Sequence, residues 1–382
     1  MKITLQRTSP NYRQKLSTHQ IMRDLTIGLI VIVIYSLIFY YMQFKETTDY
    51  VIKVALIYAV SIITALITES VWALIHKKKI NEQIKNSFPL VTAIIFALTL
   101  PVGTPLYVVA IGSFISIFFG KLVYGGFGQN IFNPALVGRV IVHLSFGASL
   151  TTSLSTTGVD AVSQATPATM LAATHWMGGQ GFQYSLLQLF LGQHLGTIGE
   201  TCAAIILIVG IVLTLRHVFD LRIPVAYIGT VLLLSEVFAL VNGLSVLTYP
   251  FTQLFVGGVM FGAVFMATDP VTSPTNPLGK ILYGIGLGFL TMIIRLKANY
   301  PEGVLFSILI MNMFTPFIDS MILGRTSEKI KKQWIAIGIS LAIAVGCVFG
   351  IAHSIKNEQT EENAQRAEEV QLVLVYEQEA RQ

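Results

Sequence analysis

The chain has 382 residues, of which 53% are hydrophobic and only 12% are charged, and its formal net charge is +5. So large an apolar share exceeds what one soluble core of this size requires, and it predicts an all-α polytopic membrane protein. The small positive charge does not indicate nucleic-acid binding, because the basic residues fall in short clusters at the ends of apolar runs.

The N-terminal segment, residues 1–24, is polar and precedes an apolar run over about residues 25–43. This run is too long for the apolar region of a signal peptide. Charged residues, rather than a small-residue cleavage site, follow it. We therefore expect the run to remain as the first membrane span.

Apolar runs long enough to cross a bilayer recur along the chain. Full-length candidates lie at about residues 25–43, 51–75, 105–123, 131–149, 196–216, 223–242, 251–267, 281–296, 302–323 and 333–353. A shorter run at about 89–101 is either a tilted span or a re-entrant segment. The runs predict a first helix block over 25–149, a second over 196–323 and an additional C-terminal span over 333–353.

Basic residues near the ends of spans indicate which ends face the cytoplasm. If the run at 89–101 crosses the membrane, all basic clusters fall on one side: Lys2, Arg7, Arg13, Lys15, Arg23, Lys77, Lys78, Lys79, Lys85, Lys121, Arg139, Arg216, His217, Arg222, Lys280, Arg325, Lys329, Lys331 and Lys332. The re-entrant alternative would put every downstream cluster outside. The sequence therefore predicts a cytoplasmic N-terminus, with the loop 150–195 and the polar acidic tail 354–382 outside.

The loop 150–195 carries the pattern Asp-x-x-Ser-x-Ala-Thr, formed by Asp160, Ser163, Ala165 and Thr166. It is similar to the acceptor site of the extracytoplasmic flavin transferase, which joins the phosphate of FMN to the hydroxyl of the final threonine. The small residues leave room for a large enzyme, and a proline follows Thr166 and disfavours a helix across it. Ordinary loop residues also match short motifs by chance. The basic clusters independently predict that this loop lies outside the cytoplasm, where the flavin transferase works. This location favours attachment of FMN at Thr166.

Two segments interrupt apolar runs with helix-breaking and polar residues. Residues 125–135 read Gly-Gly-Phe-Gly-Gln-Asn-Ile-Phe-Asn-Pro-Ala, and residues 266–277 read Met-Ala-Thr-Asp-Pro-Val-Thr-Ser-Pro-Thr-Asn-Pro. Paired breaks at membrane depth often mark a ligand or ion site between repeats. Alternatively, both segments are ordinary cytoplasmic loops, since Lys121, Arg139 and Lys280 place them near the inner surface.

Acidic residues within or beside the apolar runs are candidates for an ion path. Glu69 lies in the second span and Glu236 in the seventh, where an unpaired carboxylate is costly. The alternative interpretation of each residue is a protonated acid that forms a hydrogen bond with a neighbouring helix. Asp269 lies beside Thr268 and Thr272, and together they form an oxygen-rich cluster of the kind that binds a hard cation. Alternatively, the Asp269 side chain caps the next segment. Neither the cysteines nor the histidines show metal-ligand spacing, so no metal site is expected.

Taken in chain order, the segments at residues 125–135, 160–167 and 265–272 resemble the D-type subunit of the Rnf complex and, more distantly, the B-type subunit of the sodium-translocating NADH:quinone oxidoreductase. The segments at residues 9–22 and 300–304 fit the Rnf subunit better. The likeness covers about residues 9–325, and it implies a bundle of about ten membrane helices in two repeats.

The resemblance also implies a membrane flavoprotein within a multi-subunit redox pump of the bacterial cell membrane. Such complexes pass electrons between ferredoxin and NAD and move Na⁺ or H⁺. FMN would be joined to Thr166 by a flavin transferase, and the partners would be the other Rnf-type subunits and membrane lipid. The family can also hold a second, non-covalent flavin such as riboflavin, which no motif places here. Without a nicotinamide fingerprint or an iron–sulfur cysteine cluster, the chain alone is expected to catalyse no complete reaction, so no catalytic residue is assigned.

The C-terminal part departs from this family. The additional span 333–353 leads into a Glu/Gln-rich tail, a composition typical of a solvated helix or of disorder. A second functional class also stays open: a secondary transporter or channel with inverted repeats and no flavin, in which the loop motif is accidental.

Overall fold

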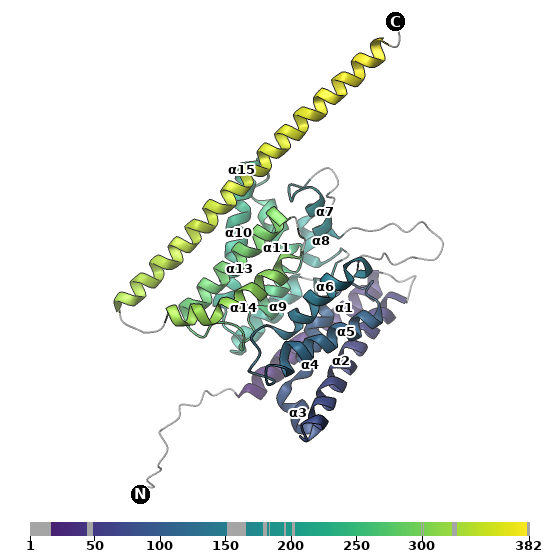
Figure 1. Ribbon diagram of the computed structural model, residues 1–382, viewed down its shortest axis with the longest axis vertical. Coiled ribbons are helices and arrows are strands. Elements are labelled where there is room, and N and C mark those ends of the chain that lie inside the picture. The colour runs from purple at the N-terminus through teal and green to yellow at the C-terminus, as the bar shows by residue number, and fades with distance from the viewer. Residues whose placement is uncertain are drawn as a thin grey trace, which may run out of the picture.

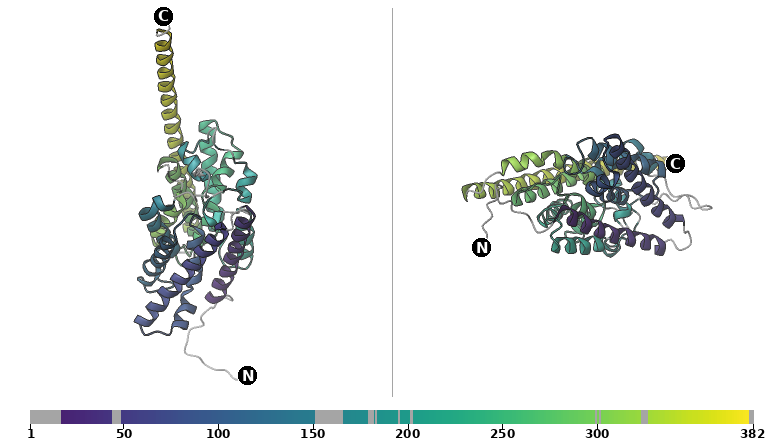
Figure 2. Two further views of the ribbon diagram at one scale, coloured as in Figure 1. Left: turned by 90° about the vertical axis from the view of Figure 1, so that its right-hand side faces the viewer. Right: turned by 90° about the horizontal axis from the view of Figure 1, so that it is seen from below.

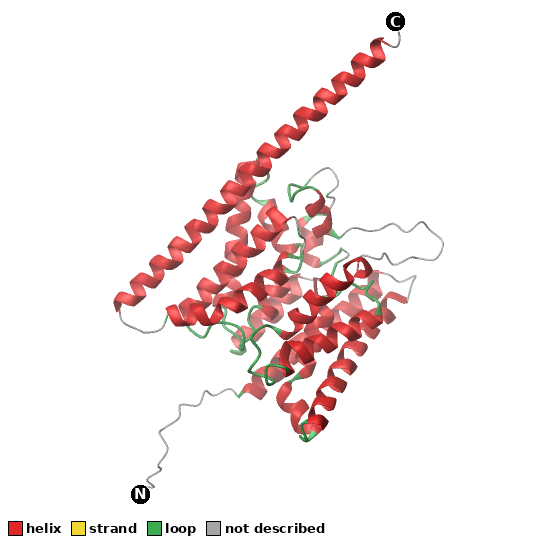
Figure 3. Ribbon diagram, in the orientation of Figure 1, coloured by secondary structure: helices red, strands yellow, loops and turns green. Residues whose placement is uncertain are grey.

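The computed structural model describes residues 17–43, 49–150, 166–178, 182, 184–194, 196–200, 203–298, 300, 302–322 and 327–379. Within these ranges the chain forms helices joined by loops, without a β-strand (Figure 3). One isolated antiparallel bridge pairs Pro101 with Thr197. The predicted all-α class is confirmed.

The first half contains the helices that follow the N-terminal segment. They are α1 (Thr18–Gln43), α2 (Asp49–Ile75), α3 (Ile80–Ser87), α4 (Pro89–Leu98), α5 (Leu106–Ile117), which continues as the π-helix η1 (Phe118–Leu122), and α6 (Pro134–Leu150). Phe88 separates α3 from α4 with a positive φ of 51°, and Pro89 then starts α4, where a missing N–H costs nothing. The short run therefore forms a ten-residue helix with nearly every side chain buried inside the bundle.

The second half begins with short helices and ends with a long one. The short elements are α7 (Pro167–Ala173), α8 (Leu186–Leu191) and η2 (Ile198–Glu200). The longer ones are α9 (Ala203–Leu215), α10 (Arg222–Asn242), α11 (Thr248–Phe255), α12 (Val259–Phe261) continuing as η3 (Gly262–Met266), α13 (Pro277–Ala298), α14 (Gly303–Met321) and α15 (Ser327–Glu379).

The predicted spans correspond to these helices, although several are shorter than predicted. Among the described residues, six helices are long and apolar enough to cross a membrane, or seven if the bent pair formed by α11 and α12–η3 counts as one span. Shorter apolar helices occupy residues 89–98, 106–122, 134–147 and 203–215. The chain is thus a multi-pass membrane protein.

The predicted span over residues 251–267 corresponds to a broken helix. The structure bends by 68° between Phe255 and Val259. Val256 is extended, and the two glycines after it, Gly257 and Gly258, have φ values of 73° and 67°. Only glycine adopts this left-handed backbone without steric cost, so the pair allows the break that a hydropathy pattern cannot reveal.

The helices pack in corresponding ways in the two halves. In the first half α2 packs against α4 and α5, and α5 packs against α6; in the second half α10 packs against α11 and α13, and α13 packs against α14 (Figure 1). This recurrence supports the predicted repeats. We call the end of the bundle where α1 begins and α3 lies the α3 face, and the other end the opposite face.

Helix α15 packs along α10 and α13 and then continues beyond the bundle, as Figure 1 and the left view of Figure 2 show. Two contacts hold it at the opposite face: Lys356 Nζ donates to the Val241 carbonyl at 2.9 Å, and Lys297 pairs with Glu358 at 3.7 Å. The predicted span 333–353 and most of the predicted tail 354–382 lie on this one continuous helix.

The predicted topology can be tested by single-cysteine labelling in a background lacking Cys202 and Cys347. We expect an impermeant thiol reagent to label Thr360→Cys in intact cells, because α15 emerges on the opposite face. Glu82→Cys on α3 should be labelled only after the cells are opened. Labelling of Glu82→Cys in intact cells would contradict the orientation.

Candidate functional site

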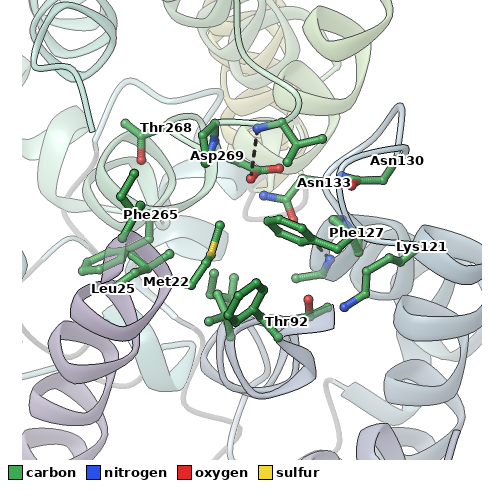
Figure 4. Close-up of a pocket in the computed structure, with 18 of the residues that line it drawn as sticks. Met22, Leu25, Thr92, Lys121, Phe127, Asn130, Asn133, Phe265, Thr268 and Asp269 are labelled. Carbon is green, nitrogen blue, oxygen red and sulfur yellow. Dashed lines mark hydrogen bonds between the residues drawn. The ribbon is translucent and has the colours of Figure 1, made fainter. Parts of the chain in front are cut away.

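The two motif segments meet at a pocket on the α3 face, between the halves of the bundle. The space between the residues that line it is about 670 Å³, a volume that includes space open to solvent. Its walls come from α1, α4, η1, the loop between η1 and α6, the start of α6, η3, and the loops after α9 and η3. Side chains from these elements enter it from all sides (Figure 4): Met22, Leu25, Thr92, Lys121, Phe127, Asn130, Asn133, Phe265, Thr268 and Asp269. The pocket is mainly apolar, with amide, hydroxyl and charged groups on its rim.

Asn133 joins the two motifs to each other. Its Oδ1 accepts from the Ala135 N–H at 3.1 Å, which caps α6, and its Nδ2 donates to the Met266 carbonyl at 3.1 Å. Its backbone N–H donates at 3.0 Å to the side-chain amide oxygen of Asn312, when that amide is oriented to satisfy its neighbours. Gly120 packs so closely on Pro134 that a Cβ would lie 2.8 Å from the proline Cα. The motif therefore holds the start of α6 against η3 and α14.

Asp269 caps its own turn and also faces the pocket. Oδ2 accepts from the Thr272 hydroxyl at 3.0 Å, and Oδ1 lies 3.5 Å from the Val271 N–H. Thr268 directs its hydroxyl to the Val264 carbonyl at 2.5 Å rather than to Asp269. The two interpretations of Asp269 from the sequence are thus compatible, since one carboxylate serves as a turn cap and as a pocket wall.

Glu69 is not a lone carboxylate but half of a buried ion pair. Its Oε1 lies 3.3 Å from Lys121 Nζ, and both side chains are 2% exposed or less. Gln83, within α3, and Ser87, at its end, donate to the Glu69 carboxylate, and Lys121 Nζ also donates to the Ser87 carbonyl at 2.6 Å. Lys121 lines the pocket, so the pair connects Glu69 to it.

A second buried pair joins the halves between α6 and α14. Arg139, 1% exposed, donates to Glu302 at the start of α14, and His143 Nδ1 lies 3.8 Å from the other Glu302 oxygen. Arg139 Nε and Nη1 have no hydrogen-bond partner among the described residues. The sequence predicts Lys121 and Arg139 only as charges at span ends near the inner surface, and the structure corrects this: both are buried in ion pairs.

Glu236 lies apart from these groups. It is exposed on α10 and makes no hydrogen bond or ion pair with any described residue. It does not line the pocket.

Thr166 is the N-cap of α7. The side chain is partly exposed, and its Oγ1 accepts from the Thr169 N–H at 3.3 Å and lies 3.1 Å from the Thr169 hydroxyl. Pro167 starts the helix after the threonine, so no helix covers the hydroxyl. The other residues of the attachment motif, Asp160, Ser163 and Ala165, lie outside the described residues.

Helix α7 is anchored to the bundle through Trp176, whose side chain is fully buried. Arg295 of α13 lies over its ring, with the guanidinium carbon 5.0 Å from the ring centroid, and Tyr249 donates to its carbonyl at 2.8 Å. The same guanidinium donates to the carbonyls of Gln253, Val256 and Gly257, at the break after α11. The segment that follows Thr166 is therefore docked on the broken helix. The sequence carried no signal for Arg295 beyond its position late in an apolar run.

Comparison with known proteins gives consistent matches. The model of the NQR2, RnfD, RnfE family matches residues 5–328. The D-type subunit of the proton-translocating ferredoxin:NAD(+) oxidoreductase complex of Clostridium ljungdahlii is 41% identical over 266 residues, which cover 68% of this chain and 79% of that protein. The corresponding subunit of the Na(+)-translocating complex of Acetobacterium woodii is 36% identical over 333 residues, covering 85% and 96%. The B-type subunit of the Na(+)-translocating NADH-quinone reductase of Azotobacter vinelandii is 36% identical over 278 residues, covering 72% and 68%.

The buried pair of Glu69 and Lys121 predicts a non-additive effect on stability. Glu69→Leu should destabilise the fold by about 3 kcal/mol, because it leaves the Lys121 ammonium buried without a counter-charge. Combining it with Lys121→Met should restore much of the loss. The melting temperature of the detergent-purified protein measures both, with Glu82→Gln in the exposed Lys79–Glu82 pair as a control that should change little. Additive losses in the double variant would contradict the pairing.

Proposed function

Because the chain belongs to the NQR2, RnfD, RnfE family, we propose that it is a membrane flavoprotein subunit of an ion-translocating oxidoreductase complex. The complex would couple electron transfer between ferredoxin and NAD to the movement of Na⁺ or H⁺, as the names of the relatives from Clostridium ljungdahlii and Acetobacterium woodii describe. These relatives translocate different ions, and neither ion is favoured by the contacts described above. The flavin-free transporter has no observation in its favour beyond the broken helix.

The observation that carries the flavoprotein assignment is the local environment of the Thr166 hydroxyl. Its hydrogen bonds to described residues are with Thr169 alone, one turn away, so esterification would break no long-range hydrogen bond among those residues. The hydroxyl is partly exposed and precedes a helix that Trp176 anchors. A phosphoester there would hold FMN on a segment that is fixed to the bundle. FMN would supply one- and two-electron redox chemistry.

The proposed orientation puts Thr166 outside the cytoplasm, where a flavin transferase could reach it. With Lys121 and Arg139 buried in ion pairs, the orientation rests on the remaining basic clusters, which still fall on one side. The N-terminus and the α3 face would then be cytoplasmic, and the chain would lie in the bacterial cell membrane with the other subunits of the complex.

We propose the pocket on the α3 face as the site of the second, non-covalent flavin. Its aromatic walls, Phe88, Phe127 and Phe265, suit the flat tricyclic ring. Asn130 Nδ2 donates to the Phe132 carbonyl at 3.1 Å, which leaves its Oδ1 as an acceptor for the polar edge of such a ring. Asn133 is already committed to structural bonds, so we assign it to shaping the site.

We also propose that the ion path passes the carboxylates near this pocket. Asp269 faces the pocket, and Glu69 is linked to it through Lys121. Glu236 is exposed on α10 and does not line this pocket, so we leave it out of the proposed path. A carboxylate exchanging with a bound cation in a low-dielectric region can change its occupancy as nearby flavins change charge.

The attachment proposal predicts that Thr166→Ala abolishes the covalent flavin, because alanine keeps the loop but removes the oxygen that forms the ester. Protein co-expressed with a flavin transferase would be run on a denaturing gel and its flavin fluorescence measured. Thr169→Ala is the matched control and should retain the fluorescence, since it leaves the Thr166 hydroxyl in place. Unmodified Thr166 in peptide mass maps of fluorescent wild-type protein would contradict the assignment.

The pocket proposal predicts that Phe127→Ala lowers non-covalent flavin content about 5-fold or more while covalent flavin is unchanged. Removing the ring deletes an aromatic wall and a stacking contact worth about 1 kcal/mol or more. Flavin released by acid precipitation would be quantified against flavin retained in the pellet. Phe251→Ala, on the exposed side of α11, is the control. Equal release from both variants would remove the pocket as the site.

A further inference from the structure

Glu236 occupies a position that this chain alone does not explain. It lies 14 residues after the start of α10 at Arg222 and six residues before its end at Asn242. Six residues of helix correspond to about 9 Å, so its Cα lies well below the end of the span. The side chain is exposed and makes no hydrogen bond or ion pair with the described residues.

The direction of the side chain keeps the carboxylate away from the nearer surface. In an α-helix the Cα–Cβ bond tilts toward the helix N-terminus. From Glu236 this direction leads toward the middle of the span and away from Asn242. A short glutamate side chain cannot reverse that displacement, so the carboxylate would face hydrocarbon, which is costly for a charged or a neutral carboxyl without a partner.

Glu236 belongs to a row of exposed residues along one side of α10. We call this row the stripe, and its members are Val225, Gly229, Glu236 and Leu240. Their spacing of four, seven and four residues puts them on one helix face. Gly229 is an open notch in this stripe: a Cβ added there would meet nothing within 4 Å. In contrast, Gly284 and Gly288 of α13 are filled by α10 itself. The notch thus serves no packing within the described part of this chain.

We propose that this stripe docks a membrane helix of another subunit of the complex, which brings a hydrogen-bond donor to Glu236. The donor would be an amide, hydroxyl or basic side chain at the depth of the carboxylate, and the partner backbone would approach closely at Gly229. A second copy of this chain is disfavoured, because two copies in the same orientation would bring two Glu236 carboxylates to one depth. The inference rests on the proposed function in assuming a multi-subunit complex.

The test uses the complete complex, expressed with an affinity tag on this chain, and counts the co-purified subunits by quantitative mass spectrometry. Glu236→Leu removes the carboxylate, and Gly229→Leu fills the notch. We expect each to lower the recovery of at least one integral membrane subunit about 10-fold or more. The matched control is Gly346→Leu on α15, another exposed glycine whose Cβ position is open, and it should leave recovery unchanged.

Two further measurements separate loss of docking from other failures. The abundance of each variant in the membrane and the covalent flavin of this chain should match the wild type, which excludes misfolding. A photo-crosslinking residue at Val225 should capture the same subunit that the variants lose. Full subunit recovery with both variants, or capture of another copy of this chain, would overturn the inference while leaving a flavin-bearing complex intact. A wild-type chain without flavin and without partner subunits would instead overturn the proposed function, and the docking inference with it.

Discussion

The arrangement of the second half depends on the buried guanidinium of Arg295. Where α11 ends, three carbonyls point away from any helical partner inside a region that excludes water, and such groups must be satisfied by the protein itself. Arg295 supplies donors to all three and places its flat face on Trp176. One side chain therefore makes the break in the span tolerable and fixes the segment that follows Thr166. The break and the proposed flavin position are consequently not independent features.

A second constraint acts at the start of α6. Asn133 ties this helix to the carbonyl of Met266, and Arg139, further along the same helix, ties it to Glu302. Both bonds cross between the halves of the bundle, so the pocket on the α3 face lies at a seam fixed by polar contacts and not by apolar packing alone. Polar contacts are directional, which gives the seam a defined register. Small molecules bind preferentially at such junctions between structural units.

Much of this architecture could be predicted from the sequence, and the failures have identifiable causes. The length of apolar runs located the helices, because a bilayer requires that length, and the Gly- and Pro-containing motifs located the two pocket segments. The break at Gly257 was missed because a window average of hydropathy does not register backbone dihedral angles. The pairing of Glu69 with Lys121 and of Arg139 with Glu302 was missed because the partners lie far apart in the sequence, on different helices. Sequence patterns express local periodicity, whereas these pairs arise from tertiary packing.

The length of α15 has a mechanical consequence. The helix is held at the opposite face by α10 and α13, near Lys356 and Glu358, and it continues to Glu379 (Figure 2). The free part is a rigid rod of about 32 Å at about 1.5 Å per residue. Such a rod acts as a lever arm: a tilt of about 10° in the helices that hold it displaces its tip by roughly 6 Å. Small rearrangements within the membrane are thereby amplified into displacements outside it, at a height where an extrinsic domain could respond to them.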